Sequence, residues 1–86
     1  MSYTVIVPKP VQKQLDALPN VVRNRVIERI ALLAEDPQPP GAIKLKGYEN
    51  SYRIRIGDYR VIYEINEKEC IVVLLRCRHR KDVYRS

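Results

Sequence analysis

The chain has 86 residues, enough for one domain with one modest core and too few for a second domain. Apolar residues make up 45% of the sequence, and because Phe and Trp are absent, Val, Ile and Leu must supply most of the core. The formal charge is +6, and no apolar run approaches the roughly 20 residues of a membrane span, which argues against a membrane protein.

The positive charge is distributed unevenly. Residues 1–43 contain five Lys or Arg against four Asp or Glu, whereas residues 44–86 contain eleven against six. Arginine dominates the second half, and its planar guanidinium group binds phosphates and carboxylates through paired hydrogen bonds. We therefore expect a nucleic acid or an acidic protein as the partner.

The two cysteines, Cys70 and Cys77, lie seven residues apart in one predicted strand, where they are poorly placed to bond to each other. The sequence shows neither the spacing of metal ligands nor a signal peptide. We therefore expect reduced thiols, a cytoplasmic location, and no metal or other cofactor.

The first half of the chain predicts a strand and a short helix. Residues 3–7 are strongly β-prone and end at Pro8. Pro10 suits the first turn of a helix over residues 10–18. The helix carries one apolar stripe, formed by Val11, Leu15 and Leu18.

A second helix is predicted to begin with Asn20 as its N-cap and to end near Ala34 or Glu35. Its apolar residues recur with helical period: Val22, Val26, Ile27, Ile30, Ala31 and Ala34. Three prolines within residues 37–40 then predict a stiff connector, after which residues 42–46 return to ordered structure.

Alternating residues on both sides of Gly57-Asp58 predict a hairpin with a two-residue type II′ turn. This register pairs Ile56 with Tyr59 and Arg55 with Arg60, and it places Arg53 on the same face as the two paired arginines. Directly opposed like charges are destabilising, so we expect an anion on this face. The other face comprises Tyr52, Ile54, Ile56, Tyr59, Val61 and Tyr63.

A further strand is predicted over residues 70–78, and its facing depends on the length of the turn after Asn66. A three-residue loop places Ile71, Val73, Leu75 and Cys77 in the core. It also places Arg76 and Arg78 on the arginine face and leaves Val72 and Leu74 there as apolar residues. A two-residue or four-residue loop reverses this and buries both arginines, so the three-residue loop is favoured.

The order β-α-α-β-β-β predicts an α+β fold in a single domain over residues 1–86. In this fold an antiparallel sheet carries a helical hairpin on one face, and its other face is open and basic.

The available side-chain chemistry is that of Arg, Lys and Tyr. His79 is the one histidine, so a Ser-His-Asp mechanism lacks its members, and we interpret His79 as an exposed residue of a basic strand. Fixed guanidinium groups stabilise charge that develops on a phosphate, and RNA supplies its own nucleophile, the 2′-hydroxyl. This set is therefore suited to RNA binding and to RNA cleavage without a metal.

Four segments together resemble the RelE/ParE toxin superfamily, and within it the RelE-type messenger-RNA interferases of toxin–antitoxin modules. They are KLKG at 44–47, YRIRI at 52–56, YRVIY at 59–63 and RHRKDVY at 78–84. The resemblance implies a RelE-like toxin that enters the ribosomal A site and cuts messenger RNA there, which inhibits translation. It also implies a cognate antitoxin that binds and neutralises the toxin.

The resemblance also implies roles for individual residues. Arg53 and Arg55 match two basic strand residues, more often Lys, that contact the scissile region, and Arg60 matches the arginine that stabilises the phosphate. Arg78 matches an arginine proposed as general acid, and Tyr84 matches a tyrosine that stacks on the cleaved nucleotide. General phosphate contacts are expected from Lys44, Lys46, Arg76 and Arg80.

Two other readings of the same fold remain open. One is a ParE-like toxin that poisons DNA gyrase through protein contacts. The other is a non-catalytic module member that only binds RNA or antitoxin.

Overall fold

The computed structural model describes residues 2–47 and 49–79. Its elements in chain order are β1 (Thr4–Ile6), α1 (Lys9–Asp16), α2 (Asn20–Leu32), β2 (Ile43–Lys44), β3 (Ser51–Ile56), β4 (Tyr59–Asn66) and β5 (Ile71–His79). The strands form one sheet in the order β1-β5-β4-β3-β2, in which β1 runs parallel to β5 and the other neighbours are antiparallel. The predicted α+β fold is confirmed, but the sheet is mixed and not purely antiparallel, because the predicted first strand runs parallel to β5, and the short β2 is an additional strand.

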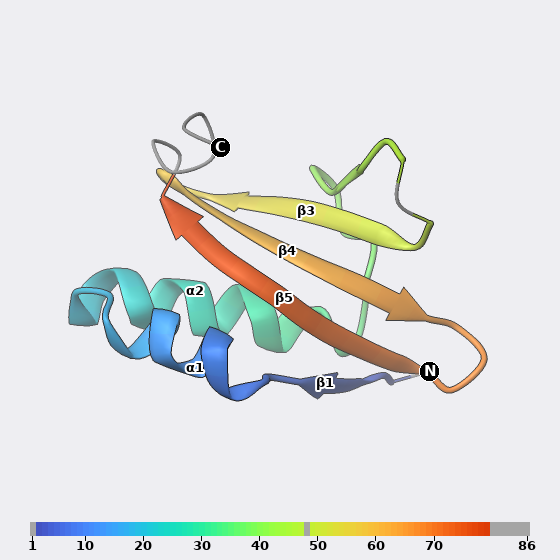
Figure 1. Cartoon of the computed structure of the whole chain (residues 1–86), viewed down its shortest axis with the longest axis horizontal. Coiled ribbons are helices and arrows are strands. Elements are labelled where there is room, and N and C mark those ends of the chain that lie inside the picture. Colours follow the sequence, from blue (N-terminus) through green and yellow to red (C-terminus); the bar gives the residue numbers. More distant parts are fainter. Residues whose placement is uncertain (1, 48, 80–86) are drawn as a thin grey trace.

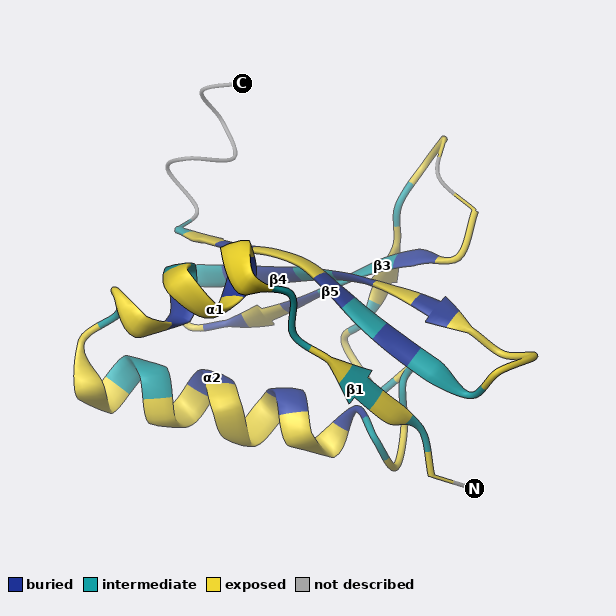
Figure 2. Cartoon of the chain, turned by 60° about the horizontal axis from the view of Figure 1, so that its bottom comes forward, coloured by how far each residue is buried: buried dark blue, intermediate teal, exposed yellow. Residues whose placement is uncertain are grey.

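Both helices lie on the same face of the sheet (Figure 1). The buried residues of the helices lie on the side that faces the strands, and in the described part of the chain no helix covers the opposite face (Figure 2). The core between the layers consists of Val11, Leu15, Val26, Ile30 and Leu33 from the helical side and Ile54, Ile56, Val61, Tyr63, Ile65, Val72, Leu74 and Cys77 from the sheet. Each large apolar side chain buried there contributes roughly 1.5–3 kcal/mol.

The second helix differs from its prediction at both ends. Pro19 occupies the N-cap position, and the side-chain oxygen of Asn20 accepts a hydrogen bond from Arg23 at 2.9 Å instead of capping the helix. The helix ends at Leu32, and Leu33 is buried just beyond it, whereas Ile27 is 44% exposed. The apolar residues cover more than one side of this helix, so their spacing alone did not define its buried stripe.

The hairpin of β3 and β4 has the predicted register. Ile56 pairs with Tyr59 and Arg55 pairs with Arg60. Of the two turn residues, only Gly57 has a positive φ, which is 59°. A type II′ turn requires a positive φ at the first central residue and not at the second. The core face of the hairpin is therefore confirmed, and Arg53, Arg55 and Arg60 lie on the other face.

The predicted facing of β5 is wrong in its first half. Asn66 pairs with Ile71, so the turn has four residues, and Val72 and Leu74 are fully buried in the core. Ile71, Val73 and Leu75, predicted to be core residues, are half-buried or exposed.

A β-bulge explains why the second half of β5 nevertheless faces as predicted. Tyr63 pairs with Leu74 but Ile62 pairs with Arg76, so Leu75 is an extra residue in the ladder. Beyond the bulge Cys77 is buried beside Val61, and the arginines on either side of it are exposed. The four-residue turn buries the apolar pair, and the bulge keeps the arginines out of the core.

Tyr63 ties the proline-rich connector to the sheet. Its ring is fully buried, and its hydroxyl donates a hydrogen bond of 2.7 Å to the backbone carbonyl of Pro37. Burial, with smaller contributions from Tyr52 and Asp36, raises the pKa of the Tyr63 hydroxyl from 10.0 to about 12. The folded protein therefore favours the neutral phenol.

We expect the substitution Tyr63→Phe to lower the free energy of unfolding by about 1 kcal/mol, because one hydrogen bond is lost and the Pro37 carbonyl loses its donor. It should also change the pH dependence. In the wild type, the unfolded phenol ionises near 10 and the folded one near 12, so stability falls as pH rises across this window. Urea unfolding below and within this window should show a smaller alkaline loss for the variant; an equal loss would contradict the assignment.

Candidate functional site

Three arginines form a row across the open face of the sheet. Arg60 on β4 is opposed by Arg55 on β3 and by Arg78 on β5. The Cα atoms of directly opposed residues on neighbouring strands lie about 5 Å apart, so the three side chains leave the sheet side by side. The row therefore presents three guanidinium groups side by side, an arrangement whose chemistry suits an anion such as a phosphate.

A second row lies next to the first, and in it Ile62 is flanked by Arg53 and Arg76. The two rows together form the arginine face: Arg53, Arg55, Arg60, Ile62, Arg76 and Arg78. Five of the predicted site residues are therefore brought together, and Ile62 is an apolar residue among them that the sequence analysis did not single out.

Arg60 differs from its neighbours in burial. Its side chain is only 6% exposed, whereas those of Arg55, Arg76 and Arg78 are exposed. With little water around it, the charge of this guanidinium is less screened than the charges of its exposed neighbours. Weakly screened positive charge is of the kind that stabilises negative charge in a transition state.

The backbone of β5 beside the arginine face is fixed by α1. β1 pairs with β5 only from Ile71 to Val73, so it does not reach the second half of the strand. There the backbone N–H of Cys77 donates a hydrogen bond of 2.7 Å to the side-chain oxygen of Gln14 on α1. The residue held in this way stands between Arg76 and Arg78, so Gln14 supports their backbone from the helical side.

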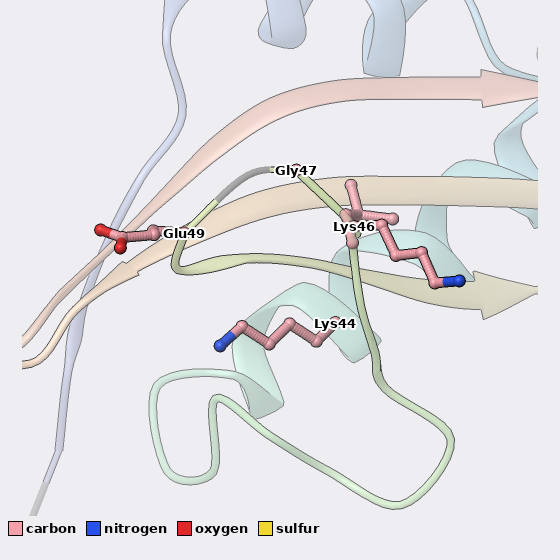
Figure 3. Close-up of a pocket in the computed structure, with 5 residues that line it drawn as sticks. Lys44, Lys46, Gly47 and Glu49 are labelled. Carbon is pink, nitrogen blue, oxygen red and sulfur yellow. The ribbon is translucent and has the colours of Figure 1, made fainter.

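Of the two predicted lysines, Lys44 does not lie on the arginine face. Lys44 pairs with Tyr52, a residue of the core-facing set, so its register places it on the opposite side from the arginines. Lys44, Lys46 and Glu49 line an open pocket of about 490 Å³, and the two ammonium groups point in different directions (Figure 3). Any contact that Lys44 makes with RNA would be on the other side of the sheet from the arginine rows.

Two predicted site residues, Arg80 and Tyr84, lie outside the described residues. His79 is described and is half-buried, not exposed as predicted. Its ring packs edge-on against Tyr59, with ring centroids 5.1 Å apart and an interplanar angle of 88°. Aromatic packing therefore accounts for part of its environment.

An apolar pocket of about 160 Å³ lies beside the second row, lined by Leu45, Ser51, Ile62, Leu75 and Arg76. The sequence pattern predicts Leu75 in the core, so the sequence alone does not reveal this pocket. The bulge is what turns Leu75 outward, where it is 38% exposed.

The described residues show no sign of a metal site, a reactive thiol or a membrane-spanning helix. Within residues 2–47 and 49–79, no three His, Cys, Asp or Glu side chains gather as metal ligands would. Burial raises the pKa of the Cys77 thiol, which favours the unreactive neutral form. None of the described helices is long and apolar enough to cross a membrane.

Comparison with known proteins places this arrangement among toxins. The model of the family described as ParE toxin of type II toxin–antitoxin system, parDE, matches residues 5–84. Toxin RelE3 of Methanocaldococcus jannaschii is 34% identical over 88 residues, which cover 93% of each protein. Toxin RelG of Mycobacterium tuberculosis is 31% identical over 86 residues, which cover 99% of each.

A solved structure agrees with the family match. A chain in the crystal structure of the archaeal RelE-RelB complex from Pyrococcus horikoshii OT3 superposes with a TM-score of 0.83 and 38% identity, covering 93% of this chain and 97% of that one. The helical hairpin on a five-stranded sheet is thus the fold of this RelE-like class of toxins. The chain belongs to the ParE toxin family of type II toxin–antitoxin systems, with RelE3 and RelG as relatives.

Proposed function

We propose that this toxin is a ribosome-dependent endoribonuclease, which acts in the cytoplasm on messenger RNA in the ribosomal A site and so inhibits translation. The observation that carries the proposal is the row of Arg55, Arg60 and Arg78, with its central guanidinium buried and the outer two exposed. Such a row fits one phosphodiester held between three positive charges.

The proposed reaction uses the substrate's own nucleophile. The 2′-hydroxyl loses its proton to solvent water and attacks the adjacent phosphorus, the bond from phosphorus to the 5′ oxygen breaks, and a 2′,3′-cyclic phosphate and a 5′-hydroxyl end result. Arg60 stabilises the charge on the phosphate oxygens, and Arg78 donates a proton to the leaving 5′ oxygen. Arg53 and Arg55 orient the scissile nucleotide, and Tyr84, outside the described residues, stacks on it.

The need for a ribosome follows from the weakness of these groups as proton carriers. Arginine is a poor proton donor and acceptor at neutral pH, so proton transfer by Arg78 contributes little. Most of the rate must then come from orientation of the attacking oxygen and from charge stabilisation. A ribosome that holds the messenger RNA in place supplies much of that orientation.

The partners follow from the same proposal. General phosphate contacts are assigned to Lys44, Lys46, Arg76 and Arg80. A cognate antitoxin is expected because similar chains were crystallised as toxin–antitoxin complexes, including the RelBE2 complex of Mycobacterium tuberculosis at 28% identity and a TM-score of 0.79. No metal or other cofactor enters the proposed reaction.

The proposal is tested by expressing the toxin without antitoxin and mapping RNA ends on two matched transcripts, one translated and one lacking its start codon. Cleavage of the translated transcript alone is the expected result. Equal cleavage of both would contradict ribosome dependence. No cleavage and no growth defect would favour the reading of a module member that only binds.

A gyrase-directed toxin is the second candidate, because the family model that matches residues 5–84 is that of ParE. The same cultures distinguish it. Intact transcripts together with induction of the DNA-damage response would favour gyrase as the target, whereas cut transcripts without that response would favour the ribonuclease.

A further inference from the structure

A second arginine-lined pocket lies at the outer edge of β3. It has a volume of about 270 Å³, and its walls include Arg53 and Arg55 of β3, Arg29 of α2, and Gly41 and Ile43 of the segment that enters β2. Arg53 and Arg55 belong to the arginine face, whereas Arg29 comes from the helical layer on the other side of the sheet. The pocket therefore connects the two sides around the edge of β3.

The edge is accessible because β2 is short. It pairs with β3 only at Tyr52 and Arg53, and among the described residues no strand pairs with the outer edge of β3 from Ile54 to Ile56. Gly41, with a φ of 93°, has no described atom within 4 Å of the position where a Cβ would lie. An extended ligand is thus not blocked at this wall.

The charge of the pocket is of one sign. Three arginines line it, and no carboxylate is among the described residues that do so. Arg29 and Arg55 are exposed and Arg53 is half-buried, so all three are within reach of a ligand from solvent. A phosphate that enters this space meets guanidinium groups from more than one side, and their planar fork matches its oxygens.

We propose that this pocket binds a phosphodiester of the RNA strand that flanks the scissile nucleotide, with Arg29 as the residue that distinguishes this subsite from the arginine face. The inference rests on the proposed ribonuclease function. RNA is favoured over an acidic peptide because the proposed function already places RNA on the rows, and Arg53 and Arg55 belong to both the rows and the pocket. A strand lying on the rows therefore continues directly into the pocket.

The test compares Arg29→Gln with Arg25→Gln, a matched control one helical turn away that does not line the pocket. Binding of a fluorescein-labelled, 2′-O-methylated single-stranded RNA, which resists cleavage, is measured by anisotropy over a salt series. An oligoglutamate peptide of equal charge serves as the second probe. Both substituted positions are exposed, so both variants should retain the wild-type circular dichroism spectrum.

We expect Arg29→Gln to weaken RNA binding several-fold and to lower the slope of log Kd against log salt by about 0.7, the value for one single-strand phosphate. Arg25→Gln should leave the slope unchanged, and oligoglutamate binding should respond less than RNA binding. Equal effects of the two variants, an unchanged slope, or a larger loss for oligoglutamate would each overturn the subsite. Cleavage of translated messages by the wild type is measured separately, so failure of the subsite and failure of the proposed function are distinguishable.

Discussion

Replacing Arg60 with methionine is expected to abolish growth inhibition and to reduce messenger-RNA cleavage by about 100- to 1,000-fold, the usual cost of losing one fixed charge-stabilising donor. Methionine keeps most of the length of the side chain in a position that is only 6% exposed, so packing is largely retained while the charge is lost. The measurement is the amount of cleaved message after induction without antitoxin, quantified by mapping of RNA ends.

Two further variants separate charge from geometry. Arg60→Lys keeps the charge but not the planar fork, so we expect an intermediate loss of cleavage. Arg25→Met removes one exposed charge from α2, away from the arginine face, and should leave cleavage unchanged. Full toxicity of Arg60→Met, with normal folding, would show that the row of arginines is not the reaction centre.

The substitution Leu74→Lys is expected to unfold the protein, whereas Leu75→Lys is expected to be tolerated. Leu74 is fully buried and Leu75 is 38% exposed, although the two are neighbours of the same type. An unpaired charge in the core costs several kcal/mol, comparable with the roughly 5–15 kcal/mol that stabilises a whole domain. Exposed substitutions usually change stability by less than about 1 kcal/mol.

This pair tests the register of β5 directly. With a three-residue turn and no bulge, Leu75 would be the core residue and Leu74 would face outward. Thermal unfolding followed by circular dichroism should show a native transition for Leu75→Lys and none for Leu74→Lys. The reverse pattern would mean that β5 alternates without a bulge.

The sequence predicted the hairpin well because its information is local. Gly57 supplies the positive φ that the turn requires, and a two-residue turn leaves one register for Arg55 and Arg60. The apolar alternation on both strands agrees with that register. Local turn chemistry and side-chain pattern therefore gave the same answer, and the central arginines followed from it.

The facing of β5 was not predictable in the same way. Its consecutive apolar residues from Ile71 to Leu75 fit either alternation, so the pattern did not define the turn length. The prediction that Arg76 and Arg78 lie outside the core was correct. The bulge at Leu75, and not the length of the turn, places them there. A bulge depends on contacts with neighbouring strands, which a single sequence does not reveal.

The contribution of Arg29 was also outside the reach of sequence reasoning. It lies on the polar side of a helical pattern, where a solvent-exposed charge is the ordinary interpretation. Only the packing of α2 against the β3 edge places it in one pocket with Arg53 and Arg55. Residues that meet through tertiary packing leave no spacing signal along the chain.

The parallel pairing of β1 with β5 has a consequence for the order of folding. Residues Thr4 to Ile6 pair with Ile71 to Val73, so this contact joins segments separated by most of the chain. Contacts of such long range form slowly because a large loop must close first. During synthesis β1 has no sheet partner until residues 71–73 have left the ribosome, so β1 is the strand that joins the sheet late, after β3 and β4 are free to pair with each other.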